Sequence, residues 1–297
     1  MQRHYRALFI ILLIAGFTTS TYGNEFIILR SKPYGLFSMF HYVLYYLQKY
    51  ERSKIVGFKV DFAETGQYFD SNIGSNWWEY YFEPIVLGEQ NNADQLTIIE
   101  ENTFLDQDIV EFEFSTSIEE NNKLINKYIK VKERILNKIN NFQSSNFSNK
   151  YVIGVHYRGT DKVYLNYEAD RISYIKVMEE ISKKVSTLPK NMDYKIFVAT
   201  DEFLFLHFML YRFGEKICYY ETKRSVNGIP LHLDKDRNPY QAGEDALIDA
   251  LLLSRVDFLI RTSSNLSRCS RYFNPQLPVL ELSKRKQEPV PCAEFIR

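Results

Sequence analysis

Apolar positions in the first half of the chain follow two periods, one typical of strands and the other of helices. The apolar runs at 25–30 (EFIILR) and 54–62 (KIVGFKVDF) predict strands, and the stretch at 36–50 (LFSMFHYVLYYLQKY) predicts an amphipathic helix. Residues 119–142 repeat apolar side chains at helical spacing, which predicts one long helix. The polar stretch at 143–150 (QSSNFSNK) is the best candidate for a domain boundary.

The second half of the chain alternates regularly between strands and helices. Its predicted strands are short apolar runs at 151–157, 194–200, 216–221, 257–262 and 279–282. Strands that alternate with helices at this spacing predict an α/β lobe with a parallel, doubly wound sheet. We therefore expect an N-terminal lobe at 24–148 and a C-terminal lobe at 149–297.

The first 23 residues differ from the rest of the chain. Arg3 and Arg6 precede the apolar run at 7–17, and the polar stretch TTSTYG follows it. This order is typical of a secretory signal peptide, and the run is shorter than the roughly 20 residues of a transmembrane helix. We expect residues 1–23 to direct the protein into the secretory pathway or out of the cell. The alternative is an uncleaved anchor that attaches the protein to a membrane.

Composition and charge limit the kinds of molecule that we expect the protein to bind. The chain has 37 basic and 37 acidic residues, so its formal net charge is zero, and we expect no nucleic-acid partner. Its 22 Tyr and 22 Phe residues are explained first by core packing, with sugar stacking as the alternative. Three widely spaced cysteines without a CxxC pair exclude a cysteine-rich zinc site.

Polar side chains gather where the strand at 151–157 ends. His156, Arg158, Asp161 and Lys162 all lie at its carboxyl end, which in an open α/β sheet is the edge where ligands bind. An arginine can hold two oxygens of a diphosphate at once, and the lysine adds a second positive charge. The alternative is a structural salt bridge between Arg158 and Asp161.

Acidic residues follow the next strand of this half. Thr200, Asp201 and Glu202 stand directly before a predicted helix. Carboxylates at such positions commonly accept hydrogen bonds from the free N–H groups at the helix start. Capping is therefore the favoured interpretation for at least one of the two acids.

A third group of candidates lies on and after the helix that contains GEDALIDALLLS at 243–254. Asp245 and Asp249 are four residues apart on one helix face, and Asp249 is set among apolar residues, where an unpaired carboxylate is costly. The ring N–H groups of a ligand could satisfy Asp249, and so could a neighbouring backbone group. Ser264 then stands at a helix start, which suits phosphate binding and plain N-capping equally.

The chain contains no GxSxG, HExxH, Walker or GxGxxG motif, so hydrolase, metalloprotease, P-loop and dinucleotide-binding functions lose support. The order of three motifs instead resembles that of the α1,6-/NodZ-like fucosyltransferases, a GT-B family in which they read roughly as HVRRTDKV, ATDD and a helix–strand–SS segment. The motifs are GVHYRGTDKV at 154–163, IFVATDE at 196–202 and LIDALLLSRVDFLIRTSSNLSR at 247–268. Weaker matches extend this resemblance over most of 26–278.

The resemblance implies a GDP-fucose site between two Rossmann-like lobes of a GT-B fold, with the acceptor side in the N-terminal lobe and nucleotide-sugar binding in the C-terminal lobe. It assigns the β-phosphate to Arg158 and a further phosphate contact to Ser264. It gives recognition of the guanine base to His156 and Asp249. It also implies that Gly35 lets a turn of the first lobe approach the nucleotide.

The resemblance also places four side chains around the donor–acceptor site, namely Asp161, Lys162, Asp201 and Glu202. Two positions depart from the family pattern. Gly159 stands where the family has a second arginine, and Asn166 stands where the family has its catalytic carboxylate. Glu168, two residues later, is the replacement that we expect to act as the catalytic base.

These observations together predict an inverting, metal-independent glycosyltransferase that moves fucose from GDP-fucose to a glycan acceptor without a cofactor. The catalytic candidates are Arg158, Asp161, Lys162 and Glu168. A carboxylate would deprotonate the acceptor hydroxyl while the two cations neutralise the departing GDP. Two alternatives stay open. One is a GT-B transferase that uses another nucleotide sugar, and the other is a degenerate, exported carbohydrate-binding protein, which Gly159 and Asn166 would favour.

Overall fold

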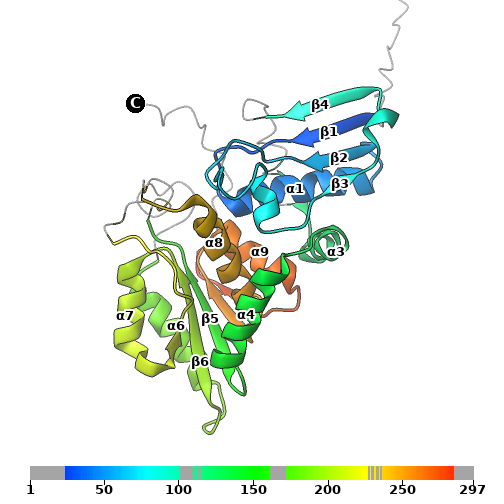
Figure 1. Cartoon of the computed structure of the whole chain (residues 1–297). Coiled ribbons are helices and arrows are strands. Elements are labelled where there is room, and N and C mark those ends of the chain that lie inside the picture. The colour runs from blue at the N-terminus through cyan, green and yellow to red at the C-terminus, as the bar shows by residue number, and fades with distance from the viewer. Residues whose placement is uncertain are drawn as a thin grey trace, which may run out of the picture.

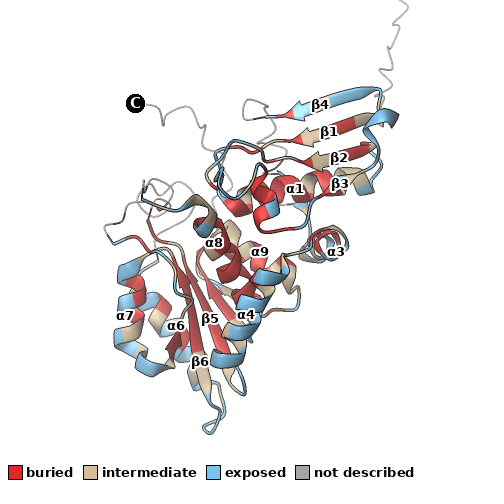
Figure 2. Cartoon of the chain, viewed as in Figure 1, coloured by how far each residue is buried: buried red, intermediate tan, exposed pale blue. Residues whose placement is uncertain are grey.

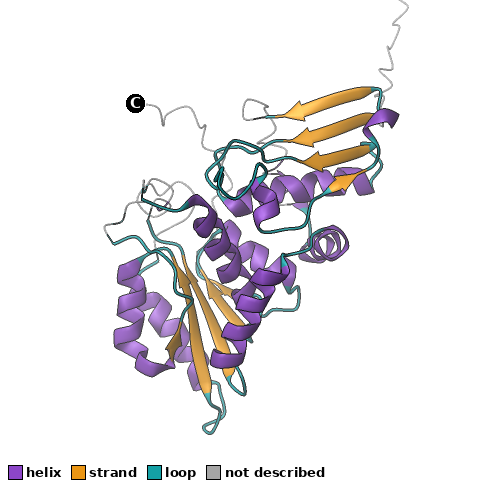
Figure 3. Cartoon of the chain, viewed as in Figure 1, coloured by secondary structure: helices purple, strands orange, loops and turns teal. Residues whose placement is uncertain are grey.

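The computed structural model describes residues 24–100, 109, 111–112, 115–160, 172–226, 228, 231, 234 and 236–283. Within these ranges the chain forms two α/β lobes, each built on its own sheet (Figure 1, Figure 3). The signal peptide or anchor predicted at 1–23 lies outside the described residues, as do Asp161, Lys162 and Glu168. None of the helices in the described ranges is long and apolar enough to cross a membrane.

The N-terminal lobe contains a four-stranded sheet in the order β3-β2-β1-β4. Its strands are β1 (Glu25–Leu29), β2 (Gly57–Val60), β3 (Val86–Leu87) and β4 (Gln95–Ile99), and the 3-10 turn η2 (Gln90–Asn92) precedes β4. β1 pairs in parallel with β2 and β4, while β3 runs antiparallel to β2. β1 and β2 confirm the two predicted strands. The apolar pattern does not predict β3, which has only two residues, or β4, which buries only its last residue.

Helix α1 (Leu36–Glu51) lies between the N-terminal sheet and the C-terminal lobe, and it therefore buries most of its circumference (Figure 1, Figure 2). The aromatic segment beside it contains the 3-10 helix η1 (Trp77–Tyr80). Asn76 caps this helix, because its Oδ1 accepts a hydrogen bond from Trp78 N at 3.2 Å. The Trp78 ring in turn stacks on Phe82 at 4.2 Å between centroids. Most aromatic residues of this segment thus belong to the core.

The C-terminal lobe contains five parallel strands in the order β7-β6-β5-β8-β9. These strands are β5 (Tyr151–Tyr157), β6 (Tyr194–Thr200), β7 (Ile217–Cys218), β8 (Phe258–Arg261) and β9 (Val279–Glu281). This is the strand order of a doubly wound sheet, as the alternation of strands and helices predicted. The order reverses between β5 and β8, and ligands bind at such a reversal in open α/β sheets.

Helices cover both faces of the C-terminal sheet (Figure 1). The outer face carries α6 (Tyr174–Ser186) and α7 (Phe203–Phe213), which is followed by the 3-10 turn η3 (Gly214–Lys216). The face toward the N-terminal lobe carries α4 (Glu133–Asn146), α8 (Pro239–Leu253) and α9 (Asn265–Phe273). Figure 2 shows β5 and β6 buried along most of their length between these layers.

Residues 119–142 form two helices rather than the single helix that their apolar spacing predicted. Helix α3 (Ile118–Tyr128) ends before α4 begins at Glu133. Between the two helices, Glu83 N donates to Lys130 O at 2.8 Å, and Lys132 N donates to Tyr81 O at 2.9 Å. These bonds to the aromatic segment replace helical hydrogen bonds, so the helix breaks although its apolar pattern continues. The lobe boundary placed at 148 and 149 stays a prediction.

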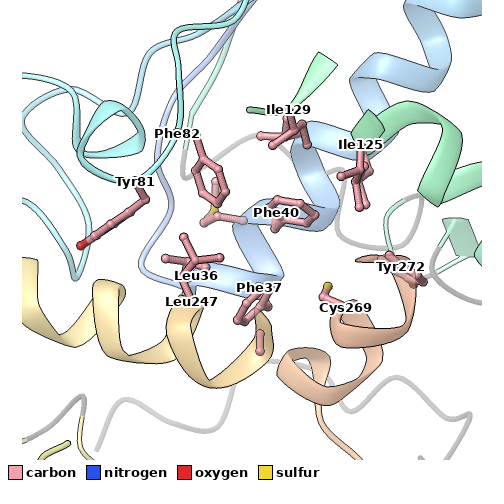
Figure 4. Packing of buried hydrophobic residues seen from close by; sticks show 14 of the residues in the cluster. Leu36, Phe37, Phe40, Tyr81, Phe82, Ile125, Ile129, Leu247, Cys269 and Tyr272 are labelled. Carbon is pink, nitrogen blue, oxygen red and sulfur yellow. The ribbon is translucent and has the colours of Figure 1, made fainter. Parts of the chain in front are cut away.

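Buried apolar side chains join the two lobes into one continuous core. Figure 4 shows Phe37 and Phe40 of α1 facing Leu247 of α8 and the α9 residues Cys269 and Tyr272. The two lobes therefore share the hydrophobic stabilisation that burial of these side chains provides.

A buried carboxylate adds polar contacts to this seam. Glu244 of α8 forms ion pairs with Arg134 and Lys138 of α4, and it accepts a hydrogen bond from Tyr240 Oη at 3.0 Å. Burial by itself would raise the pKa of Glu244, but these hydrogen bonds hold it below its usual range. Arg134 also donates to the carbonyl of Tyr80 in the N-terminal lobe, so the network fixes the position of α8 against both lobes.

Candidate functional site

A cavity of about 890 Å³ lies between the two lobes, at the carboxyl edge of the C-terminal sheet. The turn at 33–38 and Tyr68 line it from the N-terminal lobe, and the ends of β5 and β6, the face of α8 and the start of α9 line it from the other. Six of the predicted site residues line this cavity, namely Gly35, His156, Arg158, Asp201, Asp249 and Ser264. They come from distant parts of the sequence, and the reversal of strand order between β5 and β8 brings most of them together.

Two neighbouring residues hold Arg158, which directly follows the carboxyl end of β5. Its backbone N–H donates to Thr262 Oγ1 at 2.8 Å, which ties the end of β5 to the end of β8. Its Nη1 lies 2.5 Å from Asp201 Oδ2. The Asp201 side chain is only 8% exposed, whereas that of Arg158 is 25% exposed. The guanidinium is thus anchored on one side and accessible from the cavity.

Asp201 organises the turn that follows β5. Besides the ion pair with Arg158, it accepts hydrogen bonds from Gly159 N at 2.9 Å and from Thr160 Oγ1 at 2.7 Å. Thr160 adopts a left-handed backbone conformation with φ of 48°, which few non-glycine residues adopt without such support. Asp201 therefore acts on the described turn as a positioning residue.

The capping interpretation of the acidic pair is not what the structure shows. Glu202 occupies the N-cap position of α7, but its side chain makes no capping hydrogen bond. Its backbone N–H instead donates to Thr200 Oγ1 at 3.2 Å. The alternative role for Arg158, a salt bridge with Asp161, involves a residue outside the described part of the chain and stays a prediction, while among the described residues Arg158 pairs with Asp201.

Glu202 packs against Gly159 in the turn after β5 and is not among the described residues that line the cavity. A Cβ atom added to Gly159 would lie only 2.8 Å from the Glu202 carboxyl carbon and 3.0 Å from its Cβ. The Glu202 side chain therefore fills the space that a larger residue at position 159 would need. This contact explains physically why glycine fits where the family pattern has a second arginine. The donor contact expected of Glu202 stays a prediction.

Asp249 is a buried carboxyl group on the cavity wall. It is 7% exposed, and its Oδ1 has no hydrogen-bond partner among the described residues. Burial raises the pKa of Asp249 to about 8, and the charge of Arg224 opposes this rise only in part. A buried group with a strongly shifted pKa and an unused oxygen on a cavity wall is typical of a ligand contact. The sequence leads us to expect a partner for Asp249, and among the described residues no protein group fills that role at Oδ1.

His156 provides a second buried polar group on the same cavity. It is 4% exposed, and its Nδ1 makes no hydrogen bond with any described residue. Burial lowers the pKa of His156 to about 3, and the nearby cations Arg261 and Arg158 contribute to this decrease. The imidazole is therefore neutral at physiological pH, and it can either donate or accept a hydrogen bond depending on its tautomer.

Ser264 stands at the start of α9 and confirms one of the two roles that the sequence allowed for it, N-capping. Its Oγ accepts a hydrogen bond from Leu266 N at 3.3 Å, so it caps the helix, and it also lines the cavity. The N-terminal end of a helix carries partial positive charge, which favours an anion there. The neighbouring Asn265 donates to Ser38 Oγ at 3.1 Å and so connects α9 with the N-terminal lobe. The phosphate contact of Ser264 stays a prediction.

Gly35 stands at the N-cap of α1 and lines the cavity. Its φ of −62° is open to any residue. The nearest described atom to an added Cβ would be Tyr68 Oη at 3.8 Å, an ordinary contact. Packing within the described protein therefore leaves room for a side chain here, and the approach of this turn to the nucleotide stays a prediction.

Sequence reasoning missed several residues that shape the site. Arg224 is buried beside Asp249, and its Nη atoms donate to the carbonyls of Thr222 and Tyr220 at 3.0 and 2.8 Å. Tyr68 lines the cavity and accepts a hydrogen bond from the Leu36 N–H at 2.9 Å. Both residues lie in irregular segments of mixed polarity, so no periodic pattern marked them. Only the fold brings them to the cavity.

A metal ion has no evident protein site in the described ranges. They contain no group of three or more histidine, cysteine, aspartate or glutamate side chains placed to hold one. The independence from metal that the sequence led us to expect stays a prediction.

Comparisons with known proteins were made for both sequence and fold. A family model described as Nodulation protein Z (NodZ) matches residues 109–288. No curated protein sequence matches the chain significantly.

Several solved structures share the fold. A NodZ alpha-1,6-fucosyltransferase co-crystallised with GDP is 18% identical, with a TM-score of 0.58, and the match covers 86% of this chain and 94% of that one. A fucosyltransferase NodZ from Bradyrhizobium is 17% identical, with a TM-score of 0.58 and coverage of 89% and 99%. A variant of Arabidopsis thaliana FUT1 in complex with GDP is 12% identical, with a TM-score of 0.53 and coverage of 91% and 76%. These matches confirm the expected GT-B fold.

Proposed function

The chain belongs to the NodZ family, and from this premise we propose that it transfers fucose from GDP-fucose to a glycan acceptor. The observation that carries the proposal is that one cavity holds both a buried Asp249 oxygen, which has no hydrogen-bond partner among the described residues, and an anchored Arg158 guanidinium. The first suits the donor groups of a base, and the second suits a diphosphate. A volume of about 890 Å³ is ample for a nucleotide sugar. One similar NodZ structure was co-crystallised with GDP, and another was soaked with GDP-fucose.

The chemistry of Asp249 favours guanine as the base. Guanine presents a ring N–H and an amino N–H side by side, and one carboxylate can accept both. Uracil presents a single N–H between two carbonyl oxygens, and these oxygens would face the carboxylate unfavourably. His156, neutral and with an unused Nδ1, is available for a further contact to the same base. This chemistry supports a guanosine donor over a uridine donor.

The diphosphate would lie between Arg158 and the start of α9. Asp201 orients the guanidinium, and the Arg158 side chain is 25% exposed on the cavity wall, so it is placed to contact phosphate oxygens with little reorganisation. Ser264 and the N-terminal end of α9 would add partial positive charge. Negative charge on the departing GDP grows toward the transition state, so these groups would stabilise the transition state more than the ground state.

The proposed reaction is an inverting displacement at the anomeric carbon of fucose. The acceptor oxygen would form a bond to this carbon while the bond to the β-phosphate oxygen breaks, and a carboxylate would take the acceptor proton. Glu168 is the proposed base, and Asp161 and Lys162 are proposed to line the donor–acceptor site; all three residues lie outside the described ranges. We propose that Arg158 and Lys162 supply the positive charge that a metal ion supplies in other transferases.

The acceptor and the location of the reaction are also part of the proposal. A glycan acceptor would enter from the open side of the cavity, between the two lobes. Residues 1–23 would serve as a signal peptide for the secretory pathway or export, or as an anchor that attaches the protein to a membrane. A secretory lumen, or an anchor with the lobes in the cytoplasm, would give access to sugar nucleotides.

A donor screen tests the proposal directly. The purified protein is incubated with GDP-fucose, GDP-mannose or UDP-sugars, and hydrolysis or transfer is measured with and without EDTA. We expect turnover of GDP-fucose that persists in EDTA. Turnover of UDP-sugars alone would refute the assignment of a guanosine donor. Binding of glycans without turnover of any donor would instead support a carbohydrate-binding protein.

A further inference from the structure

A second carboxylate lies one helical turn from Asp249 and has no part in the function proposed so far. Asp245 lines the same cavity from the same face of α8. Residues four apart on a helix have Cβ atoms about 5–6 Å from each other. The electrostatic influence of Asp245 raises the pKa of Asp249, which agrees with this closeness. The two acids thus form a pair on the cavity wall.

Asp245 is held in place but keeps one oxygen unused. Gln241, one turn earlier on α8, donates through Nε2 to Asp245 Oδ1 at 2.7 Å. No described residue donates a hydrogen bond to Oδ2, and no described lysine or arginine forms an ion pair with either acid. Burial raises the pKa of Asp245, so the group is also partly removed from water. Arg224 near Asp249, and Arg237 and Lys138 near Asp245, offset the burial of these acids only in part. Two acids in such a place with no ion pair to a described cation are unfavourable unless a ligand brings hydrogen-bond donors.

Guanine carries one more donor than Asp249 alone can use. A carboxylate that accepts the ring N1–H and one hydrogen of the 2-amino group leaves the second amino hydrogen without a partner. Two hydrogen bonds of about 2.9 Å, one on each side of the amino nitrogen, would set the distance between the two acceptor oxygens. That distance is close to the separation of the Cβ atoms of two residues one helical turn apart. The spacing of Asp245 and Asp249 therefore matches an amino group held between them.

We propose that Asp245 is a specificity-determining residue that accepts a hydrogen bond from the 2-amino group of guanine, beside Asp249. The inference rests on the proposed function, because it requires that a guanosine nucleotide occupies the cavity. Two carboxylates on one amino group would make the site discriminate between guanine and a purine that lacks only this group. The unused oxygen of the buried Asp249 is the independent sign that this wall receives a ligand.

Inosine diphosphate provides a direct test, because it differs from GDP only in lacking the 2-amino group. Affinities of GDP and IDP are measured by calorimetry for the unmodified full chain and for Asp245→Asn. We expect Asp245→Asn to weaken GDP binding by about tenfold or more and to leave IDP binding within about twofold. Asp249→Asn should weaken both nucleotides, since both carry the ring N–H. Loss of the preference for GDP without any loss of IDP affinity should therefore be seen only when Asp245 changes.

Controls separate this role from the other possibilities. Asp193→Asn removes a carboxylate from the same lobe at the opposite edge of the sheet and should change neither affinity. Asp245→Ala is a second variant, and melting temperatures verify that each protein is folded. Equal weakening of GDP and IDP by Asp245→Asn would overturn the proposal in favour of a ribose or phosphate contact, and unchanged GDP binding would also overturn it. Failure of the unmodified protein to bind either nucleotide would refute the proposed function itself, a result distinct from both.

Discussion

Arg158 and Asp201 form the closest described ion pair on the wall of the cavity, with 2.5 Å between Nη1 and Oδ2. The same carboxylate accepts hydrogen bonds from the Gly159 N–H and the Thr160 hydroxyl, so it holds both the cation and the turn that carries it. An arginine fixed in this way keeps its other N–H groups in one plane and ready for two oxygens of one ligand. A lysine could keep the charge but not this arrangement.

We therefore expect Arg158→Lys to be nearly as damaging as Arg158→Ala. The loss of a charge-assisted hydrogen bond costs about tenfold to a hundredfold in affinity, and it should appear in both GDP affinity and turnover. Calorimetry with GDP and a transfer assay measure the two effects. Arg212→Lys, on the exposed surface of α7, is the matched control. Normal GDP affinity in a protein with a lower melting temperature would mean that Arg158 has a purely structural role.

Binding of GDP should depend on pH through Asp249. The N–H groups of guanine bind the ionised form of the Asp249 carboxyl group, whereas in the protein without ligand the pKa of Asp249 is about 8. Binding below pH 8 must therefore release a proton. Affinity should rise by up to about tenfold for each pH unit between about pH 6 and about pH 8, and then level off. Calorimetry in buffers of different ionisation enthalpy would detect the released proton. Asp249→Asn should abolish the dependence, and a flat profile in the unmodified protein would contradict this role.

His156 should stay neutral in the folded protein far below the usual range of histidine. Its folded-state pKa of about 3 is lower than the unfolded value, so the unfolded chain binds the extra proton first. The stability that this difference provides is present above about pH 6.5 and is lost as the pH falls toward 3. NMR titration of the imidazole should show no protonation above about pH 4. A midpoint near pH 6 would show that the ring is solvated.

The contact between Gly159 and Glu202 should couple these two positions. Gly159→Ala should destabilise the protein by about 1–3 kcal/mol, the usual cost of overpacking, because its Cβ would overlap the Glu202 side chain. In the background Glu202→Ala, the same change should cost much less. Denaturant unfolding of the four proteins in this double-mutant cycle measures the coupling. Additive effects would show that the two residues do not compete for space.

The catalytic base is tested by Glu168→Gln. We expect turnover to fall by roughly 10² to 10⁴, the range for loss of general-base catalysis, with GDP affinity unchanged. Glu180→Gln, on the exposed side of α6, is the matched control. An unchanged rate for Glu168→Gln would transfer the role to Asp161 or Asp201.

The sequence by itself determined most of the C-terminal lobe. The strands at 151–157 and 194–200 and the helices between the strands follow from local periodicity, and the structure has them at almost the same bounds. The same local reading placed His156 and Arg158 at a strand end and marked Asp249 as a carboxylate in need of a partner. These features depend on neighbours within a few residues, which is why the pattern alone could predict them.

Tertiary structure decided what depends on contacts between distant segments. The helix predicted at 119–142 breaks because Lys130 and Lys132 bond to the aromatic segment some fifty residues earlier in the chain. Asp201 holds the turn after β5 instead of capping α7, because parallel pairing of β5 and β6 brings the two strand ends together. The role inferred for Asp245 likewise depends on the cavity that faces its helix. Periodicity records which face of an element is buried, but hydrogen-bond partners are selected only when the elements pack.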